Sequence, residues 1–245
     1  MHRFKVTELG NHVFWLRGAE REHLVRVLRL SPGDAILGFD NSGREWLAEI
    51  LKIEANSVTC VMLEERQPHV EACSKVYLVA GLSKGEKLEW VIQKGTELGM
   101  VGFVPLRAKR SIMRLEGSKA SERVQRWQKI AGEAAKQSHR VREPHIFGIM
   151  DWEDIASVLP ETTQWLIAYE EEKSQGLSQT LATLVSDKPM AILIGPEGGF
   201  DLSEVRYATE HLLAQSVSLG PRILRAETAA LAALTITLAH WGDLG

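Results

Sequence analysis

The chain has 245 residues, of which 44% are hydrophobic and 25% are charged, a composition typical of a globular protein with one large or two modest domains. No stretch approaches the roughly 18 consecutive apolar residues that span a bilayer, and the N-terminal MHRFKVTELG lacks the apolar core of a signal peptide. Cys60 and Cys73 stand apart, without a CxxC or a Cys/His cluster. We therefore expect no disulfide framework, no metal and a location in the reducing cytoplasm.

The net charge of −3 conceals an uneven distribution of charge along the chain. Residues 73–145 contain 15 Lys and Arg against 7 Asp and Glu, a balance of +8, whereas residues 146–245 contain 5 against 14, a balance of −9. A basic segment in an acidic protein indicates a field directed at an anionic partner. The alternative is an ordinary solvated helical face.

Short β segments separated by turns occupy the first 70 residues and predict a small barrel of antiparallel strands. The predicted strands cover 13–16, 35–39, 46–53 and 58–63. A helix is predicted over 20–30, and SPGD and NSG are typical turns. Residues 64–73 are polar and contain a proline, so we interpret them as a linker between a domain at 1–70 and a second at 74–245.

Strands and helices alternate from residue 75 onward, which predicts an α/β domain with a mostly parallel sheet covered on both faces. The predicted strands cover 75–80, 101–104, 145–149, 164–169, 190–194 and 216–219. The predicted helices begin at 83 or 84, 118, 201 and 227. Gly99 is the expected cap of the first of these helices, and Asp201 with Glu204 forms a capping-box pattern.

Two glycine-containing loops follow the last two predicted strands. They are GPEGGF (195–200) and LGPRILRAETA (219–229), and parallel sheets bind ligands in loops at the carboxyl ends of their strands. Neither loop has the G-x-G-x-x-G or G-x-x-x-x-G-K-[ST] spacing of phosphate-binding loops. Taken alone, GPEGGF is equally consistent with an ordinary strand-to-helix turn.

Five motifs in order along the chain resemble the RsmE family of the SPOUT class of RNA methyltransferases, which methylates N3 of a uridine in 16S ribosomal RNA. They are HLVRVLRLSPGD (23–34), KGEKLEWVIQKGTELG (84–99), RWQKIAGEAAKQSHR (126–140), IGPEGGF and LGPRILRAETA. The resemblance implies an N-terminal PUA-like β-barrel and a C-terminal SPOUT α/β domain with a deep trefoil knot. It also implies S-adenosyl-L-methionine as cofactor, bound in the knot, and a homodimer.

The resemblance places the cofactor among backbone groups of the glycine loops, with Ile223 and Leu224 as apolar walls. The implied cofactor-binding residues are Ala168, Tyr169, Glu170, Ile194, Gly195, Pro196, Gly198, Gly199, Leu219, Gly220, Ile223, Leu224 and Thr228. Uridine N3 must lose a proton before it can accept a methyl group, so the site needs a base and a positive group. We assign Arg225 as the positive group and Glu197 as the candidate base. Glu227 is the rival base, and Glu197 can instead cap a helix or bind its own loop.

The basic segment is expected to contact RNA phosphates, and the barrel to select the target. The predicted RNA-binding residues are His23, Arg26, Arg29, Lys84, Lys87, Lys94, Lys109, Arg110, Arg126, Lys129, Lys136 and Arg140, and Arg114, Lys119, Arg123 and Arg142 belong to the same segment. Arg126, Lys129, Lys136 and Arg140 share one helical face by spacing. Loop packing is the alternative for Arg29, and Trp90 and Trp127 are expected to pack in the core.

Three functions remain open at this stage. The first is methylation of uridine N3 in 16S ribosomal RNA of the small subunit. The second keeps the fold and cofactor but methylates another atom, such as a ribose 2′-hydroxyl. The third is RNA binding without catalysis, against which the two intact glycine loops speak.

Overall fold

The computed structural model describes residues 1–113 and 115–244, which divide into two compact units. The N-terminal unit comprises Met1–Glu71 and Ala135–Glu143, and the C-terminal unit comprises the rest of the described chain. Within these ranges no helix has both the length and the apolar character needed to cross a bilayer. The second segment of the N-terminal unit, residues 135–143, was not expected from the sequence.

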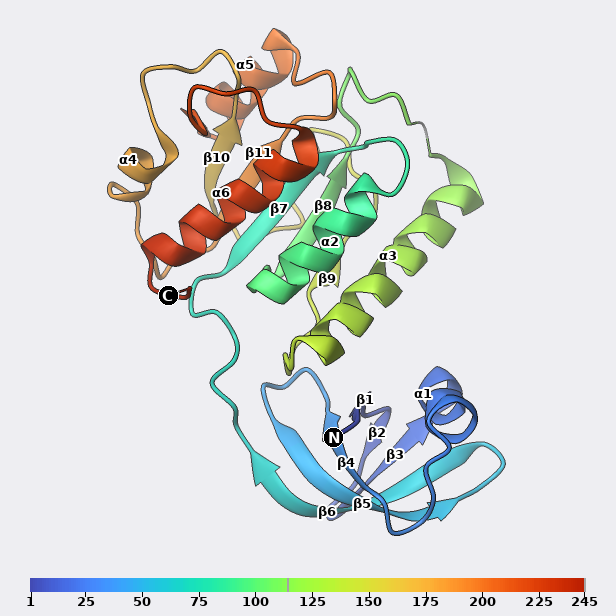
Figure 1. Ribbon diagram of the computed structural model, residues 1–245. Coiled ribbons are helices and arrows are strands. Elements are labelled where there is room, and N and C mark those ends of the chain that lie inside the picture. The colour runs from blue at the N-terminus through green and yellow to red at the C-terminus, as the bar shows by residue number, and fades with distance from the viewer. Residues whose placement is uncertain (114, 245) are drawn as a thin grey trace. The chain divides into compact units, whose positions relative to one another are not determined.

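A curved six-stranded sheet forms the N-terminal unit (Figure 1). Its strands are β1 (Arg3–Lys5), β2 (Glu8–Leu9), β3 (Val13–Arg17), β4 (Ala35–Phe39), β5 (Glu45–Ile53) and β6 (Ser57–Arg66), in the order β1-β4-β5-β6-β3-β2. The register between β5 and β6 shifts at two places, and such bulges bend a sheet. The sheet is therefore a half-barrel with β1 and β2 at its edges.

Alternating apolar side chains make the inner face of this half-barrel. Phe14 and Leu16 of β3 are fully buried and lie in one core with Trp46 and Ile50 of β5. The helical segment after β3 consists of α1 (Gly18–Glu22) and the π-helical η1 (His23–Val27), and it adds Leu24 to this core. The four strands predicted from the sequence are confirmed, and β1 and β2 were missed because each is very short.

The predicted linker is wrong at its beginning. Residues 64–66 continue β6, where Glu65 pairs with Trp46 and Arg66 pairs with Glu45. The indole nitrogen of Trp46 also donates to the Glu65 carboxylate at 3.2 Å. A polar strand is stable here because its backbone completes the ladder with β5 while its side chains face solvent.

Residues 135–143 are attached to the N-terminal unit by charged side chains. The Arg140 guanidinium, only 3% exposed, donates to Glu71 at 2.7 and 3.1 Å. The other Glu71 oxygen accepts from the backbone amides of Val141 and Arg142 at 2.9 and 3.0 Å. Lys5 pairs with Glu143 from the same unit. Glu71 thus bonds four donors at once.

A parallel six-stranded sheet forms the C-terminal unit. Its strands are β7 (Val76–Gly81), β8 (Gly102–Leu106), β9 (His145–Ile146), β10 (Gln164–Ala168), β11 (Met190–Ile194) and β12 (Gln215–Val217). Their order is β12-β10-β11-β7-β8-β9, and every pairing is parallel. The chain therefore crosses from β9 at one end of the sheet to β10 near the other, and β11 then returns between β10 and β7.

Helices cover both faces of this sheet (Figure 1). They are α2 (Lys87–Leu98), α3 (Gly117–Gln137), α4 (Leu177–Leu181), α5 (Leu202–His211) and α6 (Ala226–His240). Leu78 and Ile192 face a core shared with α2, α3, α4 and α6, whereas Val79 and Leu193 face a core shared with α5. Neighbouring residues of buried strands thus supply opposite cores, which explains why the strands are continuously apolar.

Most of the predicted α/β pattern is confirmed, including the left-handed Gly99 cap (φ 116°) and the Asp201–Glu204 capping box. The predicted start of α2 is wrong, because Gly85 adopts φ 70° and the helix begins only at Lys87. The strand predicted over 145–149 is limited to His145 and Ile146. Trp127 is buried as expected, but Trp90 is 47% exposed because it lies on the solvent side of α2.

The Glu71 network generates a prediction about stability. Replacing Arg140 by Met leaves Glu71 half-buried without its cation, which should lower the free energy of unfolding by about 3 kcal/mol. Urea denaturation of the full chain measures the change. Arg17→Met is the matched control, since Arg17 and Glu8 form a pair that is about half exposed and should contribute less than about 1 kcal/mol. Equal effects of the two substitutions would contradict the assigned role of Arg140.

Candidate functional site

Three loops of the C-terminal unit meet at one edge of its sheet. Strands β10, β11 and β12 are neighbours and run parallel, so the loops that follow them emerge side by side. Together they line an open cleft of about 1540 Å³. Small-molecule sites usually occupy roughly 300–1,000 Å³. The cleft therefore has room for a cofactor-sized molecule and part of a second one.

The two glycine-containing loops singled out in the sequence both line this cleft. Of the thirteen residues expected to hold the cofactor, Thr228 alone does not line the cleft, and it is an exposed residue in the first turn of α6. The lining residues from the expected set are Ala168, Tyr169, Glu170, Ile194, Gly195, Pro196, Gly198, Gly199, Leu219, Gly220, Ile223 and Leu224. Arg225 and Glu197 line it as well.

A third wall of the cleft was missed by the sequence analysis. It consists of residues 172–174 and 176–179, which follow β10 and lead into α4. Glu172 orders this segment by accepting hydrogen bonds from Ser174 and from the Gln175 amide. These bonds, those from Ser174 above all, keep the pKa of Glu172 below its ordinary value. The carboxyl-end rule applied to β10 would have found this wall, since β10 is a parallel strand like the others.

Backbone atoms rather than side chains form the centre of the glycine loop. Gly199 adopts φ 68°, and a Cβ there would lie 2.4 Å from an oxygen of Glu170. A Cβ on Gly195 would lie 3.0 Å from the backbone of Gly199. The loop therefore presents bare peptide groups to the cleft, as required where a ligand must approach a backbone closely.

Glu197 is held by the loop that follows β7. One of its carboxylate oxygens accepts from the Lys84 amide at 3.1 Å and from the Lys87 ammonium at 3.0 Å. Burial by itself would raise the pKa of Glu197, but the bonds from Lys87 and from the backbone outweigh burial and lower it below 4.5. Glu197 is therefore ionised at neutral pH and is a weaker base than an unpaired carboxylate.

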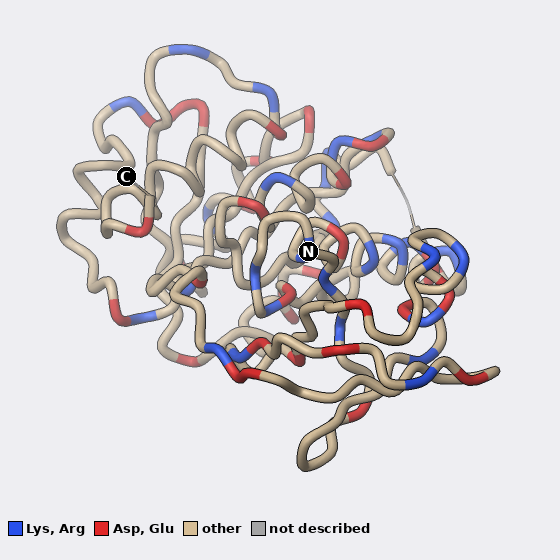
Figure 2. The backbone as a smooth tube through the Cα atoms, turned by 60° about the horizontal axis from the view of Figure 1, so that its bottom comes forward, with Lys and Arg blue, Asp and Glu red and all other residues tan. Residues whose placement is uncertain are grey.

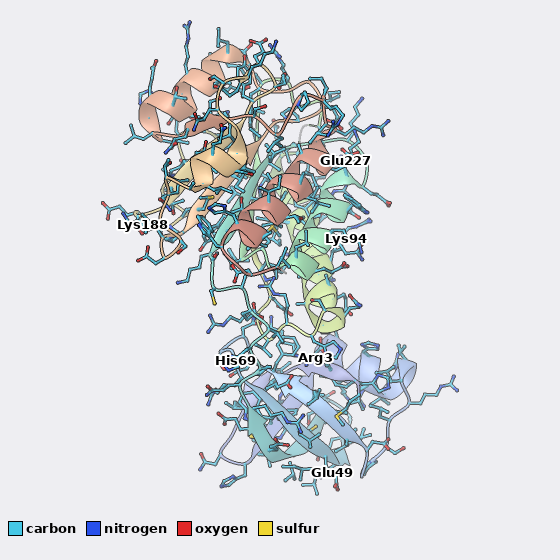
Figure 3. All side chains as sticks on the ribbon, turned by 60° about the vertical axis from the view of Figure 1, so that its left-hand side comes forward. Arg3, Glu49, His69, Lys94, Lys188 and Glu227 are labelled. Carbon is cyan, nitrogen blue, oxygen red and sulfur yellow. The ribbon has the colours of Figure 1, made fainter. Side chains whose placement is uncertain are left out.

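Glu227 occupies a different position from Glu197. It lies in the first turn of α6, where the helix dipole favours a negative charge, and Figure 3 labels it at the N-terminal end of that helix. With Ser83 and Lys87 it lines a partly open cavity of about 10 Å³, a space on the order of one water molecule. Its Oε2 is buried and accepts no hydrogen bond from the part of the chain that the structure describes.

Two arginines bring positive charge to the cleft. Arg225 stands at the N-cap position of α6 with an extended backbone (φ −65°, ψ 152°), and its carbonyl accepts from the Ala229 amide at 2.8 Å. Its side chain and that of Arg222 belong to exposed residues that line the cleft. Glu170 and Glu172 line the same cleft. The cleft therefore combines donors and acceptors of opposite charge.

Many residues predicted to bind RNA engage in ion pairs with neighbours, and Figure 2 shows basic and acidic residues interspersed along the chain. In the C-terminal unit Lys94 pairs with Glu97, and Arg126 with Glu89 at 2.7 Å. Lys84 and Lys129 are exposed. Arg114 lies outside the described residues. The Lys94 pair is a surface pair of little energetic worth, so Lys94 remains able to exchange its carboxylate for a phosphate. The Arg126 pair involves a carboxylate that is only 10% exposed.

The N-terminal unit holds the remaining predicted RNA-binding residues. Arg26 and Arg29 are exposed and His23 is half-buried against Phe4. Arg29 adopts φ 54°, an uncommon conformation for a side chain of its size. The predicted shared helical face is wrong for Arg140, because α3 ends at Gln137. Lys136 bonds Glu20, and Arg140 is buried on Glu71.

Comparison with known proteins identifies both halves of the chain. The RNA methyltransferase domain family matches residues 70–238, and the RNA methyltransferase PUA domain family matches residues 16–63. Ribosomal RNA small subunit methyltransferase E of Bacillus subtilis is 39% identical over 91% of this chain and 88% of its own length. The protein of the same name from Mesomycoplasma hyopneumoniae is 30% identical over 96% and 98%.

A solved structure agrees with these matches over the entire chain. Ribosomal RNA small subunit methyltransferase E from Neisseria gonorrhoeae, bound to S-adenosyl methionine, is 29% identical, covers 100% of both chains and has a TM-score of 0.87. The matches confirm the predicted fold class, a PUA-like domain followed by an α/β methyltransferase domain with a parallel sheet.

The contacts of Glu197 generate a prediction about pH. Because its pKa is lower in the folded chain than in the unfolded chain, its ion pair stabilises the fold above the unfolded pKa. That contribution is lost as the pH falls through the lower, folded pKa. Glu197→Gln should therefore lower the free energy of unfolding by about 1 kcal/mol at pH 7, and the difference from wild type should vanish well below pH 4.5.

Denaturant unfolding at a series of pH values measures this effect. Glu97→Gln is the control, since it removes an (i, i+3) surface pair with Lys94 that is worth only about 0.3 kcal/mol. A Glu197→Gln difference that stays constant from pH 7 to pH 3 would show that the Lys87 pair does not stabilise the fold.

Proposed function

Because the chain belongs to the ribosomal RNA small subunit methyltransferase E family, we propose that it transfers a methyl group from S-adenosyl-L-methionine to N3 of a uridine in 16S ribosomal RNA. The observation that carries this proposal is the single cleft shared by the loops after β10, β11 and β12. Residues from all three loops converge where a cofactor and a nucleotide can meet.

The residues present in the cleft fit this cofactor. Bare peptide groups of Gly195 and Gly199, where a Cβ would collide, can approach an adenine or a methionine chain closely. The side chains of Ile223, which is 82% exposed, and of half-buried Leu224 supply an apolar wall. When bound, S-adenosyl-L-methionine supplies an electrophilic methyl group. The carboxylates of Glu170 and Glu172 complement the positive charge that this cofactor carries.

The chain's own contribution to catalysis is positioning and charge. An in-line displacement depends chiefly on holding the two reacting atoms in alignment. We assign Arg225 to stabilise the negative charge that develops on the uracil oxygens once N3 loses its proton. Glu197 is our candidate base, because it lines the cleft whereas Glu227 lines only the neighbouring cavity of about 10 Å³. The Lys87 bond keeps Glu197 ionised, which is the form that accepts a proton.

RNA is held by the cations around the cleft and by the N-terminal unit. Lys84 and Lys129 are exposed residues of the C-terminal unit, and Arg26 and Arg29 are exposed residues of the N-terminal unit. The Arg26 side chain is 78% exposed although it pairs with Glu22. Phosphate contacts of this kind set affinity and position rather than sequence choice. The trefoil knot remains a prediction from the resemblance, and the domain boundaries at 70 and 74 remain predictions from the polar stretch between them.

The modification itself can be measured directly. Incubating the protein with unmodified small ribosomal subunits and S-adenosyl-L-methionine labelled in its methyl group should yield labelled 3-methyluridine after digestion to nucleosides. Arg225→Ala should slow this reaction about 10²-fold. The control Arg206→Ala changes an exposed residue of α5 and should leave the rate unchanged. Label in a 2′-O-methyl nucleoside would contradict the assigned atom, and cofactor-independent RNA binding without label would contradict catalysis.

We also propose a homodimer formed through α6. This helix contains no charged residue between Glu227 and His240, yet Thr235 and Ala239 on it are exposed and Leu231 and Ile236 are only partly buried. An apolar helix with an uncovered face is expected at a subunit interface.

Introducing a charge on this face should dissociate the dimer. Wild type should sediment at twice the chain mass of 27.3 kDa, and Thr235→Glu should sediment at the single-chain mass with an unchanged far-UV spectrum. Lys188→Glu, a charge change at an exposed residue before β11, is the control and should leave the dimer intact. A wild-type protein that sediments as a monomer at micromolar concentration rules the proposal out.

A further inference from the structure

The loop that follows β8 contacts the glycine loop instead of standing free for RNA. Lys109 and Arg110 were both predicted to contact phosphate. The Arg110 guanidinium donates to the Gly198 carbonyl at 3.1 Å and to the Asp201 carboxylate at 3.3 Å. Lys109 donates through its ammonium to Ser203 at 2.6 Å and through its amide to Glu204 at 2.8 Å. Four hydrogen bonds therefore join this loop to the glycine loop, the N-cap of α5 and the first turn of α5.

The stem of Arg110 also explains why residue 198 is a glycine. A Cβ on Gly198 would lie 3.1 Å from the Cβ of Arg110, closer than side chains normally pack. Gly198 does not have a positive φ, unlike Gly199. The glycine at 198 is thus favoured by the close approach of Arg110 and not by a left-handed backbone.

Arg110 restricts one particular peptide group, the one between Gly198 and Gly199. Its carbonyl oxygen accepts from Arg110, and its N–H donates to the Pro196 carbonyl at 2.9 Å. Both the C=O and the N–H of this peptide group are therefore hydrogen-bonded. Without the Arg110 bond the plane can rotate, because glycines on both sides impose little resistance.

The second half of the Arg110 contact fixes the end of the loop. Asp201 caps α5 by accepting from the Ser203 amide at 3.1 Å. The Ser203 bonds chiefly, with the charges of Lys109 and Arg110 added, lower the pKa of Asp201. By bridging Gly198 and Asp201, Arg110 ties the glycine loop to the first turn of the helix that follows it.

The glycine loop is therefore held from two neighbouring strands. Glu197 bonds Lys84 of the loop after β7 and Lys87 at the start of α2, and Gly198 bonds Arg110 from the loop after β8. On the opposite side Gly198 and Gly199 line the cleft. The peptide that Arg110 holds is thus one that a bound cofactor would contact.

We propose that Arg110 is a positioning residue that orients the Gly198–Gly199 peptide for cofactor binding and does not act chiefly as a phosphate contact. This assignment rests on the proposed function, since it concerns the same cleft. An ordered loop binds its ligand more tightly because the cost of ordering it has been met in the free protein.

The test compares Arg110 with a neighbour of the same type. Calorimetry without RNA should show that Arg110→Ala weakens S-adenosyl-L-methionine binding about tenfold, the effect of losing one hydrogen bond to a charged donor. Arg107→Ala is the control, because Arg107 lies in the same loop but bonds Asp151 at 2.7 Å, and it should change cofactor affinity less than about twofold. RNA affinity at fixed salt should be the same for wild type and Arg110→Ala.

Turnover and a conservative variant distinguish positioning from general stability. KM for the cofactor should rise in Arg110→Ala while kcat at saturating cofactor stays close to that of wild type. Arg110→Lys keeps the charge but cannot bridge two acceptors in a fork, so it should bind the cofactor with intermediate affinity. If Arg110→Ala does not fold, the cofactor affinity of Arg110→Lys tests the proposal.

Three results would be decisive against the proposal or its premise. Normal cofactor affinity in both Arg110 variants would overturn the positioning role. Weaker RNA binding with normal cofactor binding would make Arg110 a phosphate contact instead. A wild-type protein that does not bind the cofactor would refute the proposed function itself, which is a different outcome from a defect confined to the variants.

Discussion

The adjacency of three parallel strands is the constraint on which the site depends. Strand β10 lies between β11 and β12, and all three run in the same direction. The loops that follow them therefore all begin at one edge of the sheet. Residues 168 and 219, far apart in sequence, can then line one cleft. Strands β10 and β11 are buried on both faces, so their register is set by two cores at once, and the cleft rests on a rigid base.

The sequence of the glycine loop permits many backbone conformations, but contacts in the folded protein fix one of them. Its glycines leave room for a ligand, but they also leave the backbone free to rotate. The side chains of Lys87 and Arg110 remove that freedom by donating hydrogen bonds to Glu197 and Gly198 of the loop. Some of the cations that we predicted to bind RNA therefore stabilise the conformation of a loop of the protein. This is why the basic balance of residues 73–145 overstates the charge available to a polyanion.

Local patterns in the sequence were sufficient for the elements whose causes are local. The apolar run before GPEGGF, the Gly99 cap and the Asp201–Glu204 pair each depend on residues within one turn or strand, and each was predictable. The partners of Glu197 and Arg140 were not, because Lys87 is 110 positions from Glu197 and Glu71 is 69 positions from Arg140. The wall at residues 172–179 has neither glycine repeats nor a distinctive motif, and only its place after a parallel strand identifies it. Glu227 was correctly noted as a carboxylate near the loops, but the burial of its Oε2 depends on how α6 packs on α2.

The second segment of the N-terminal unit has a consequence for how this protein can be dissected. A fragment ending at residue 71 would retain all six strands of the half-barrel but would lack residues 135–143, leaving Lys5 without Glu143 and Glu71 without Arg140 and two amides. The N-terminal unit is therefore discontinuous in sequence, and gene fusions that transplant only the first seventy-odd codons would transfer an incomplete module.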